Sequence, residues 1–177
     1  MTSDGQPDPY GVNLWGGGYV TALPDGDLAL TNPRKPDAKP VSLPAIVANL
    51  EARGIQTPVL VRVASYLKHS IEQLNGCFAD AFKTYKYKGD YRGVFPIKVN
   101  QQRHLVEEVV SSGRPYVYGL EAGSKPELLI ALSAMDQPDG FIICNGYKDY
   151  AYMETALMAQ QCDNQVVVVL ERVEELP

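Results

Sequence analysis

The chain has 177 residues, of which 45% are hydrophobic and 21% charged, and this ordinary globular composition excludes disorder over its whole length. A net charge of −5 without a basic block argues against nucleic acid as the main partner. No apolar run approaches about 18 residues and no secretory signal opens the sequence, so no membrane span and no export are expected. Three cysteines, Cys77, Cys144 and Cys162, fit neither a disulfide framework nor a zinc pattern and suit a reducing cytoplasm.

The first 40 residues differ from the rest, because they are rich in glycine, proline and polar side chains. Residues 1–9 are expected to be a disordered start, and residues 10–40 a β segment followed by a proline-rich linker. Three short strands are predicted in the β segment, separated by glycines and a Pro-Asp-Gly turn: YGVNLW (10–15), YVTAL (19–23) and DLAL (27–30). Residues 41–177 follow a different pattern and are predicted to form a second part of the protein.

Two helices and a strand are predicted at the start of this second part. Ser42 is a suitable N-cap for a helix that Gly54 ends. The run PVLVRV (58–63) is typical of a strand, and Ser65 is expected to cap a longer helix. Apolar residues fall along one side of that longer helix: Leu67, Ile71, Leu74, Phe78 and Phe82.

Strands and helices then alternate regularly. Four strands are predicted, which begin about 23 to 25 residues apart: RGVFPIKV (92–99), PYVYGLE (115–121), GFIICN (140–145) and QVVVVL (165–170). Three helices fit between them: residues 101–112, 125–135 and 149–161. Apolar, β-branched strands between helices indicate a parallel sheet, so the predicted fold class is α/β. Four such units fit either a small open sheet or half of an eight-stranded barrel.

Function in parallel α/β folds sits at the carboxyl ends of the strands, and polar loops follow all four predicted strands here. Lys98 is the most informative residue, because a lysine at the end of an apolar strand is costly to desolvate unless it faces a cleft or is used covalently. Desolvation would also favour a nucleophilic amine suited to Schiff-base chemistry. The alternative is a lysine just past the strand that points into solvent, and the pattern alone favours that alternative.

The other loops each have an ordinary structural explanation. Ser124 and Glu127 form an S-x-x-E capping box, and Glu121 by itself is a carboxylate at a strand end. The Asn145-Gly146 pair is a turn signal, and residues 171–175 are expected to be a solvated helix start. The two histidines have no paired ligands nearby, so no metal site is predicted from the residues.

Four stretches of the chain, taken together, carry a family resemblance: YGVNLWGGGYV (10–20), YRGVFPIKVNQQ (91–102), GLEAGSKPEL (119–128) and CNGYKD (144–149). Their order and spacing resemble those of the biosynthetic arginine decarboxylases, which belong to the alanine-racemase-like, or fold-type III, decarboxylases. The second stretch is similar to the strand that carries the family's pyridoxal-phosphate lysine. The last two resemble its next two strand-end loops.

The resemblance implies that residues 41–177 are the first half of a pyridoxal-phosphate-binding (β/α)8 TIM barrel, incomplete in this chain. Residues 10–30 would be strands of a separate β domain. The implied reaction converts L-arginine to agmatine and CO2 through a Schiff base between pyridoxal 5′-phosphate and Lys98, as an entry to putrescine and spermidine synthesis. Glu121 would lie close to that lysine, and Ser124 and Glu127 on the same face of the cofactor site.

The same resemblance implies further properties. The family is described as using Mg²⁺ and as forming homo-oligomers with active sites at a subunit interface. Its chains are several times longer, and their phosphate-binding loop and substrate pocket lie beyond residue 177, so the isolated chain is expected to be inactive. Two alternatives stay open: a non-catalytic barrel homologue that binds the cofactor or a partner protein, and a decarboxylase of ornithine, lysine or diaminopimelate.

Overall fold

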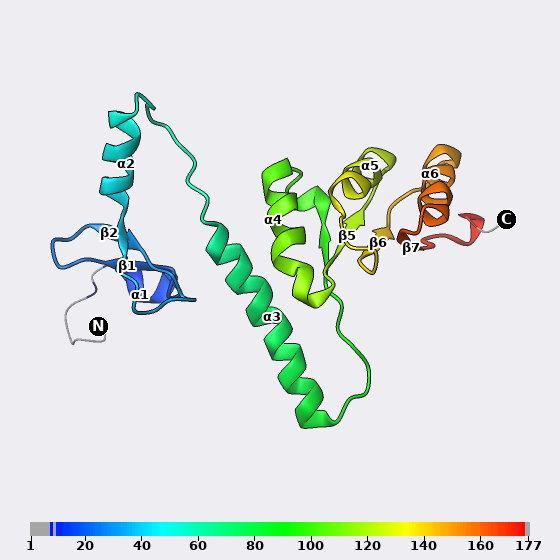
Figure 1. Ribbon diagram of the computed structural model, residues 1–177, viewed down its shortest axis with the longest axis horizontal. Helices are drawn as coiled ribbons and strands as arrows, with labels where there is room; N and C mark the ends of the chain where they lie inside the picture. Colours follow the sequence, from blue (N-terminus) through cyan, green and yellow to red (C-terminus); the bar gives the residue numbers. More distant parts are fainter. Residues whose placement is uncertain (1–7, 9, 176–177) are drawn as a thin grey trace. The chain divides into compact units, whose positions relative to one another are not determined.

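The computed structural model describes residue 8 and residues 10–175, so the expected disorder of residues 1–9 falls outside the described residues except at Asp8. The chain forms two compact units, Met1–His69 and Ser70–Pro177, and the boundary between them falls inside helix α3 (Ala64–Tyr85). Figure 1 shows the elements of each unit. The division into residues 10–40 and 41–177 stays a prediction.

The first unit contains a small antiparallel sheet and two helices. Its strands pair in the order β1 (Val20–Ala22), β2 (Leu28–Leu30) and β3 (Val41–Ser42), and its helices are α1 (Val12–Trp15) and α2 (Leu43–Ala52). The strands predicted within 19–23 and 27–30 are confirmed, as is the first predicted helix. Ser42 Oγ accepts a hydrogen bond from Ala45 N (3.3 Å), and Gly54 follows the helix with a φ of 77°.

The predicted strand YGVNLW is wrong, because Val12–Trp15 forms helix α1. Asp8 explains the difference, since its carboxylate accepts hydrogen bonds from Val12 N (2.8 Å) and Asn13 N (3.0 Å). These contacts satisfy amide groups that the start of a helix leaves free. The glycines that follow therefore lead from a helix into β1 and do not separate two strands.

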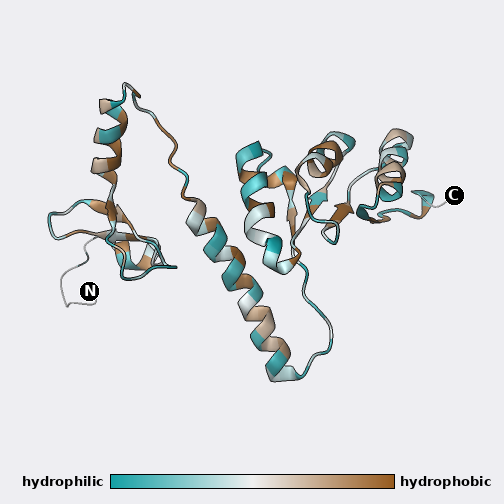
Figure 2. Cartoon of the chain, viewed as in Figure 1, coloured by the Kyte–Doolittle hydropathy of each residue, from teal (hydrophilic) through white to brown (hydrophobic). Residues whose placement is uncertain are grey.

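Residues 58–63, predicted as a strand, are not one in the structure. Figure 2 shows them as an almost continuous hydrophobic stretch between α2 and α3, and Leu60 is 75% exposed. A strand needs a neighbour for its backbone N–H and C=O groups, and no strand in the described part of the chain pairs with this stretch. Helix α3 begins at Ala64, so Ser65 lies in its first turn and is not its cap.

The second unit confirms the predicted alternation and the parallel sheet. Its strands pair in the order β4 (Val94–Pro96), β5 (Gly119–Ala122), β6 (Phe141–Cys144) and β7 (Gln165–Val168), and every pair is parallel. The helices between the strands are α4 (Arg103–Gly113), α5 (Lys125–Ala134) and α6 (Tyr150–Gln161). The fold is therefore α/β, with half the strands of a (β/α)8 barrel, and the barrel is incomplete in this chain.

Helices α4, α5 and α6 lie along one face of the parallel sheet (Figure 1). Four strand residues on this face are fully buried: Leu120, Ala122, Ile142 and Cys144. They pair across β5 and β6 in register, and they alternate with Glu121 and Ile143, which are only half-buried. The core of the unit therefore lies between the sheet and the helices, and Glu121 faces the other side of the sheet.

All four strands of the sheet are shorter than predicted, and in two cases a 3-10 turn takes up part of the predicted strand. The predicted strand 92–99 consists of β4 and a 3-10 turn, η1 (Ile97–Val99), whose Ile97 is fully buried. The predicted strand 115–121 begins with another 3-10 turn, η2 (Arg114–Tyr116), and reaches β5 after Val117 adopts a φ of 52°. Lys98 therefore lies on a turn directly after its strand and not within the strand.

The structure also bears on membrane-spanning helices and on the state of the cysteines. No helix formed by the described residues is long and apolar enough to cross a membrane. The three cysteines are free: Cys144 is buried, and Cys77 and Cys162 are exposed. The spacing that fitted no disulfide framework is thus matched by three unpaired thiols.

Gly119 gives a test of the strand packing. A Cβ at this position would lie 2.3 Å from Phe141 O and 2.8 Å from Val94 Cγ1, so no side chain fits there without a shift of the neighbouring strands. We expect Gly119→Ala to lower the free energy of unfolding by about 1–3 kcal/mol. Gly76 is the matched control, because it lies in α3 with no atom within 4 Å of a built Cβ.

Gly76→Ala should raise the free energy of unfolding by up to about 1 kcal/mol, since alanine is the better helix former. Urea unfolding followed by circular dichroism measures both variants. An unchanged midpoint for Gly119→Ala would contradict the packing described between β4, β5 and β6.

Candidate functional site

Lys98 lies at the carboxyl edge of the parallel sheet. It occupies the middle of η1, and the fully buried side chain of Ile97 anchors this turn in the core. Asn100 N donates a hydrogen bond to Ile97 O (3.0 Å), which closes the turn. The Lys98 side chain is exposed and has no hydrogen bond or ion pair with another described residue. In this structure Lys98 therefore lies just past its strand and is exposed to solvent, as the alternative prediction has it, and its amine is accessible.

Glu121 lies on the neighbouring strand, close to the same edge. It pairs in register with Pro96 on β4 and with Ile143 on β6, and Lys98 is the second residue after Pro96. Its side chain is half-buried on the face of the sheet that the helices do not cover. No hydrogen bond or ion pair joins Glu121 to Lys98 within the described residues. The strand pairing thus brings the two residues to one edge without a direct contact.

Ser124 and Glu127 form the predicted cap at the start of α5. Ser124 Oγ accepts a hydrogen bond from Glu127 N (3.4 Å), and Glu127 Oε2 accepts one from Gly123 N (2.7 Å). The reciprocal bond therefore reaches the residue before the cap and not the cap itself. Both side chains are occupied in shaping the loop that follows β5.

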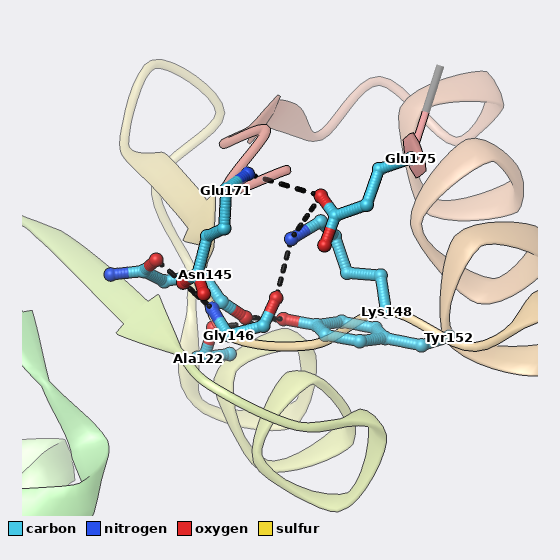
Figure 3. A network of polar contacts seen from close by, with 7 residues as sticks. All are labelled: Ala122, Asn145, Gly146, Lys148, Tyr152, Glu171 and Glu175. Atoms are coloured by element: carbon cyan, nitrogen blue, oxygen red, sulfur yellow. Dashed lines mark hydrogen bonds and ion pairs between the residues drawn. The ribbon is translucent and has the colours of Figure 1, made fainter. Parts of the chain in front are cut away.

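A buried tyrosine joins the ends of β5 and β6. The side chain of Tyr152 on α6 is 2% exposed, and its hydroxyl donates to Ala122 O (2.8 Å) and to Asn145 O (3.3 Å), as Figure 3 shows. Asn145 N also donates to Ala122 O (2.7 Å). Burial raises the pKa of Tyr152, and the nearby thiol of Cys144 acts in the same direction. The hydroxyl therefore keeps its proton and remains a hydrogen-bond donor.

The turn after β6 packs directly against the loop after β5. Gly146 has a φ of 74°, and a Cβ at this position would lie 2.5 Å from Gly123 O. Gly146 N donates to Glu171 Oε1 (2.7 Å), which comes from the segment after β7. Contacts therefore link three consecutive strand-end segments, which we call the strand-end rim: residues 122–124, 145–149 and 169–175.

A buried ion pair lies within the strand-end rim. Lys148 Nζ is 3.2 Å from Glu175 Oε2, and the two side chains are only 1% and 10% exposed. Lys148 Nζ also donates a hydrogen bond to Gly146 O. The paired oxygen of Glu175 accepts a further hydrogen bond from Glu171 N (3.1 Å). Figure 3 shows the Lys148 and Glu175 side chains directed toward each other above this network.

The ion pair corrects one prediction at a single residue. Residues 171–175 are predicted to be a solvated helix start, and residues 171–174 are indeed exposed, with a 3-10 turn, η3 (Val173–Glu175), at the end of the segment. The exception is Glu175, whose carboxylate is bound inside the rim. The hydrogen bond from Glu171 N, and then the contact with Lys148, hold the pKa of Glu175 below its ordinary value although burial opposes this. Glu175 is therefore an anion held in place and not a free surface charge.

Local sequence patterns do not identify Lys148 and Glu175 as partners within the rim, or Tyr152 as the residue that joins the ends of β5 and β6. The stretch CNGYKD has an ordinary explanation as a turn, and the acidic run near the end has one as a helix start. The only sequence signal was a lysine directly beside a turn at a strand end. Its partner lies on a different strand-end segment, which spacing along the chain does not connect to it.

The reactive group that the described residues offer at this edge is an amine. No cluster of three or more His, Cys, Asp or Glu residues that could hold a metal ion occurs in the described part of the chain. The exposed primary amine of Lys98 is a group that forms Schiff bases with carbonyl compounds. A cofactor that carries an aldehyde therefore fits the residues present.

Tyr152→Phe tests the link between the ends of β5 and β6. The change removes one hydroxyl and leaves Asn145 O without its donor, so we expect a loss of about 1–2 kcal/mol in the free energy of unfolding. Tyr118→Phe is the matched control, because Tyr118 is also buried, at 9% exposure, directly before β5, and no described residue hydrogen-bonds its hydroxyl. In urea unfolding, Tyr118→Phe should leave the free energy of unfolding almost unchanged. Equal losses of this free energy in the two variants would contradict a specific role for the Tyr152 hydroxyl.

Known proteins resemble this chain over nearly its whole length. Residues 58–177 match the family model described as "Pyridoxal-dependent decarboxylase, pyridoxal binding domain". The chain is 47% identical over 175 residues to the biosynthetic arginine decarboxylase of Gloeobacter violaceus, covering 99% of this chain and 27% of that protein. It is 46% identical over 173 residues to the biosynthetic arginine decarboxylase of a Nostoc species, covering 98% of this chain and 24% of that protein.

A solved structure agrees with the sequence matches. The crystal structure of the biosynthetic arginine decarboxylase SpeA from Campylobacter jejuni matches with a TM-score of 0.87 and 32% identity, over 97% of this chain and 28% of that chain. The chain thus spans about a quarter of the length of these relatives. The family match includes the whole parallel sheet and Lys98. The chain therefore belongs to the pyridoxal-dependent decarboxylase family and carries part of its pyridoxal-binding domain.

Proposed function

We propose that this chain supplies the amino-terminal part of an arginine decarboxylase, which releases CO2 from L-arginine to give agmatine, and that Lys98 holds its pyridoxal phosphate. The names of the relatives from Gloeobacter violaceus and Nostoc support arginine as the substrate. The observation that carries the proposal is the position of Lys98: an exposed amine at the carboxyl edge of the sheet in a pyridoxal-binding domain.

The residues present fit this cofactor. The Lys98 amine is free of ion pairs with the rest of the described chain, so it is available to an aldehyde. When bound, pyridoxal phosphate supplies an electron sink for the electron pair left on Cα as CO2 departs. The task of the chain is to present the amine at a fixed place, and the buried side chain of Ile97 beside it fixes the turn.

Glu121, Ser124 and Glu127 take different parts in the proposal. Glu121 lies in register with the strand that leads to Lys98, and its carboxylate is therefore a group that can hold or accept a proton near the Lys98 amine. Ser124 and Glu127 already bind backbone N–H groups at the start of α5. We assign them to the shape of the loop after β5 and not to the chemistry.

The proposal extends to properties that rest on the family resemblance. We place agmatine at an entry to polyamine synthesis, the protein in the cytoplasm, and the active site at the interface of a homo-oligomer. Three free cysteines support a reducing compartment. Mg²⁺ stays an expectation of the resemblance, because the described residues contain no cluster that could hold it.

Lys98 should be the lysine that reacts with pyridoxal phosphate. We expect incubation of the chain with the cofactor, borohydride reduction and peptide mapping to find a pyridoxyl group on Lys98, which Lys98→Ala removes. Lys125→Ala is the matched control, because Lys125 is also exposed and begins the helix that follows the neighbouring strand. It should leave the labelling of Lys98 unchanged. Equal labelling of all exposed lysines would contradict the assignment.

The isolated 177-residue polypeptide should release no CO2 from carboxyl-labelled arginine, because its sheet has four strands and the barrel is incomplete. A chimera that joins it to the remaining part of the Gloeobacter violaceus relative should be active, and Lys98→Ala should abolish that activity. Ornithine and lysine serve as control substrates. Release by the isolated chain would refute its inactivity, and an active Lys98→Ala chimera would refute the role of Lys98. Faster release from ornithine or lysine would refute arginine as the substrate.

A further inference from the structure

Lys148 carries a buried charge that the proposed chemistry does not use. Its side chain is 1% exposed, and Nζ lies 3.2 Å from Glu175 Oε2. Burial of an ammonium group is unfavourable unless the group is paired and hydrogen-bonded, and removal of one partner leaves the other charge uncompensated. A turn after a strand is ordinarily solvated and does not require a buried charge. The pair therefore calls for an explanation beyond formation of the turn.

The contacts of this pair lead to the loop that follows β5. The Glu175 carboxylate accepts a hydrogen bond from Glu171 N (3.1 Å), and the Glu171 carboxylate accepts one from Gly146 N (2.7 Å). Lys148 donates to Gly146 O, so the N–H and the C=O of Gly146 are both bound by this network. Gly146 in turn lies against Gly123 O, where no Cβ fits. A displacement of Lys148 would therefore also move the loop after β5, which begins two residues after Glu121.

An exposed ion pair elsewhere in the same unit shows the contrast. Lys83 Nζ lies 3.4 Å from Asp80 Oδ1 on α3, and the two side chains are 79% and 81% exposed. Exposed pairs of this kind contribute little, because solvent screens them. The Lys83 amine donates to a side-chain carboxylate, whereas the Lys148 amine also donates to a backbone carbonyl group, Gly146 O, in a strand-end turn. Of these two pairs, it is therefore the Lys148 pair that fixes a loop.

We propose that Lys148 is a positioning residue, which holds the strand-end rim in the arrangement in which pyridoxal phosphate attaches to Lys98. It acts through its contacts with Glu175 and Gly146 and not by contact with the cofactor. This inference rests on the proposed function, because it requires cofactor attachment at Lys98. The buried ion pair then supports the cofactor site from loops other than the turn that carries the reacting amine.

The experiment measures the pyridoxal phosphate concentration that gives half-maximal pyridoxyl labelling of Lys98 after borohydride reduction. The 177-residue chain is compared with Lys148→Met, Lys148→Arg and the matched control Lys83→Met, at a temperature where circular dichroism shows all four folded. Lys148→Met should raise that concentration about tenfold, as losses of supporting residues around a site commonly do. Lys148→Arg keeps the charge and should restore most of the labelling, and Lys83→Met should match the parent chain.

Amide hydrogen exchange at Gly146 gives a second readout, and it should be faster in Lys148→Met and unchanged in Lys83→Met. If Lys148→Met does not fold, Glu175→Gln answers the same question, because it removes the charge and keeps an acceptor for Glu171 N. Labelling at the parent concentration in folded Lys148→Met, or in Glu175→Gln, would overturn the positioning role and leave the proposed function intact. Absence of labelling at Lys98 in the parent chain would overturn both.

Discussion

Parallel hydrogen bonding between neighbouring strands is the constraint on which the second unit depends. Because β4, β5, β6 and β7 run in one direction, a connection must return the chain after each strand, and the carboxyl ends collect at one edge. The returning helices cover one face and bury residues such as Leu120 and Ile142 completely. Within the sheet, a charged side chain can therefore lie only at the edge or on the uncovered face, and these are the places that Lys98 and Glu121 occupy.

The same edge creates a hydrogen-bonding problem, because the ladder stops there and the last backbone groups lose their partners. Side chains solve it in this protein. Tyr152 supplies a proton to the carbonyl groups of Ala122 and Asn145, and two carboxylates take up the N–H groups of Gly146 and Glu171. The residues that satisfy the backbone also set the geometry of the loops, so stability and site geometry share the same contacts.

Sequence patterns predicted the second unit well, because each of its elements carries its own local signal. The Ser124 and Glu127 spacing specifies a helix start, and the apolar runs specify strands. Strand ends were predicted less well, since the turn at Ile97 depends on burial in a core that no short window contains. The strand predicted for residues 58–63 is wrong for a related reason. Their composition favours a strand, but a strand also needs a neighbouring strand to pair with.

The candidate site divides in the same way. Lys98 and Glu121 could be predicted, because their positions after or at the end of apolar strands are visible in one stretch of sequence. Lys148 and Glu175 could not, because their pairing depends on β6 and β7 lying side by side. Helix α1 could not be predicted for a similar reason. It begins where the Asp8 carboxylate, four residues earlier in the chain, accepts a hydrogen bond from Val12 N.

The contact between Gly146 and Gly123 determines how the rim can vary among related sequences. A side chain at residue 146 would need both a left-handed backbone and a displaced carbonyl group on the neighbouring loop. A residue larger than glycine at position 146 therefore requires the loop after β5 to move as well. For anyone who wishes to graft a different pocket onto this scaffold, the loops after β5 and β6 are best exchanged together, because this contact joins them.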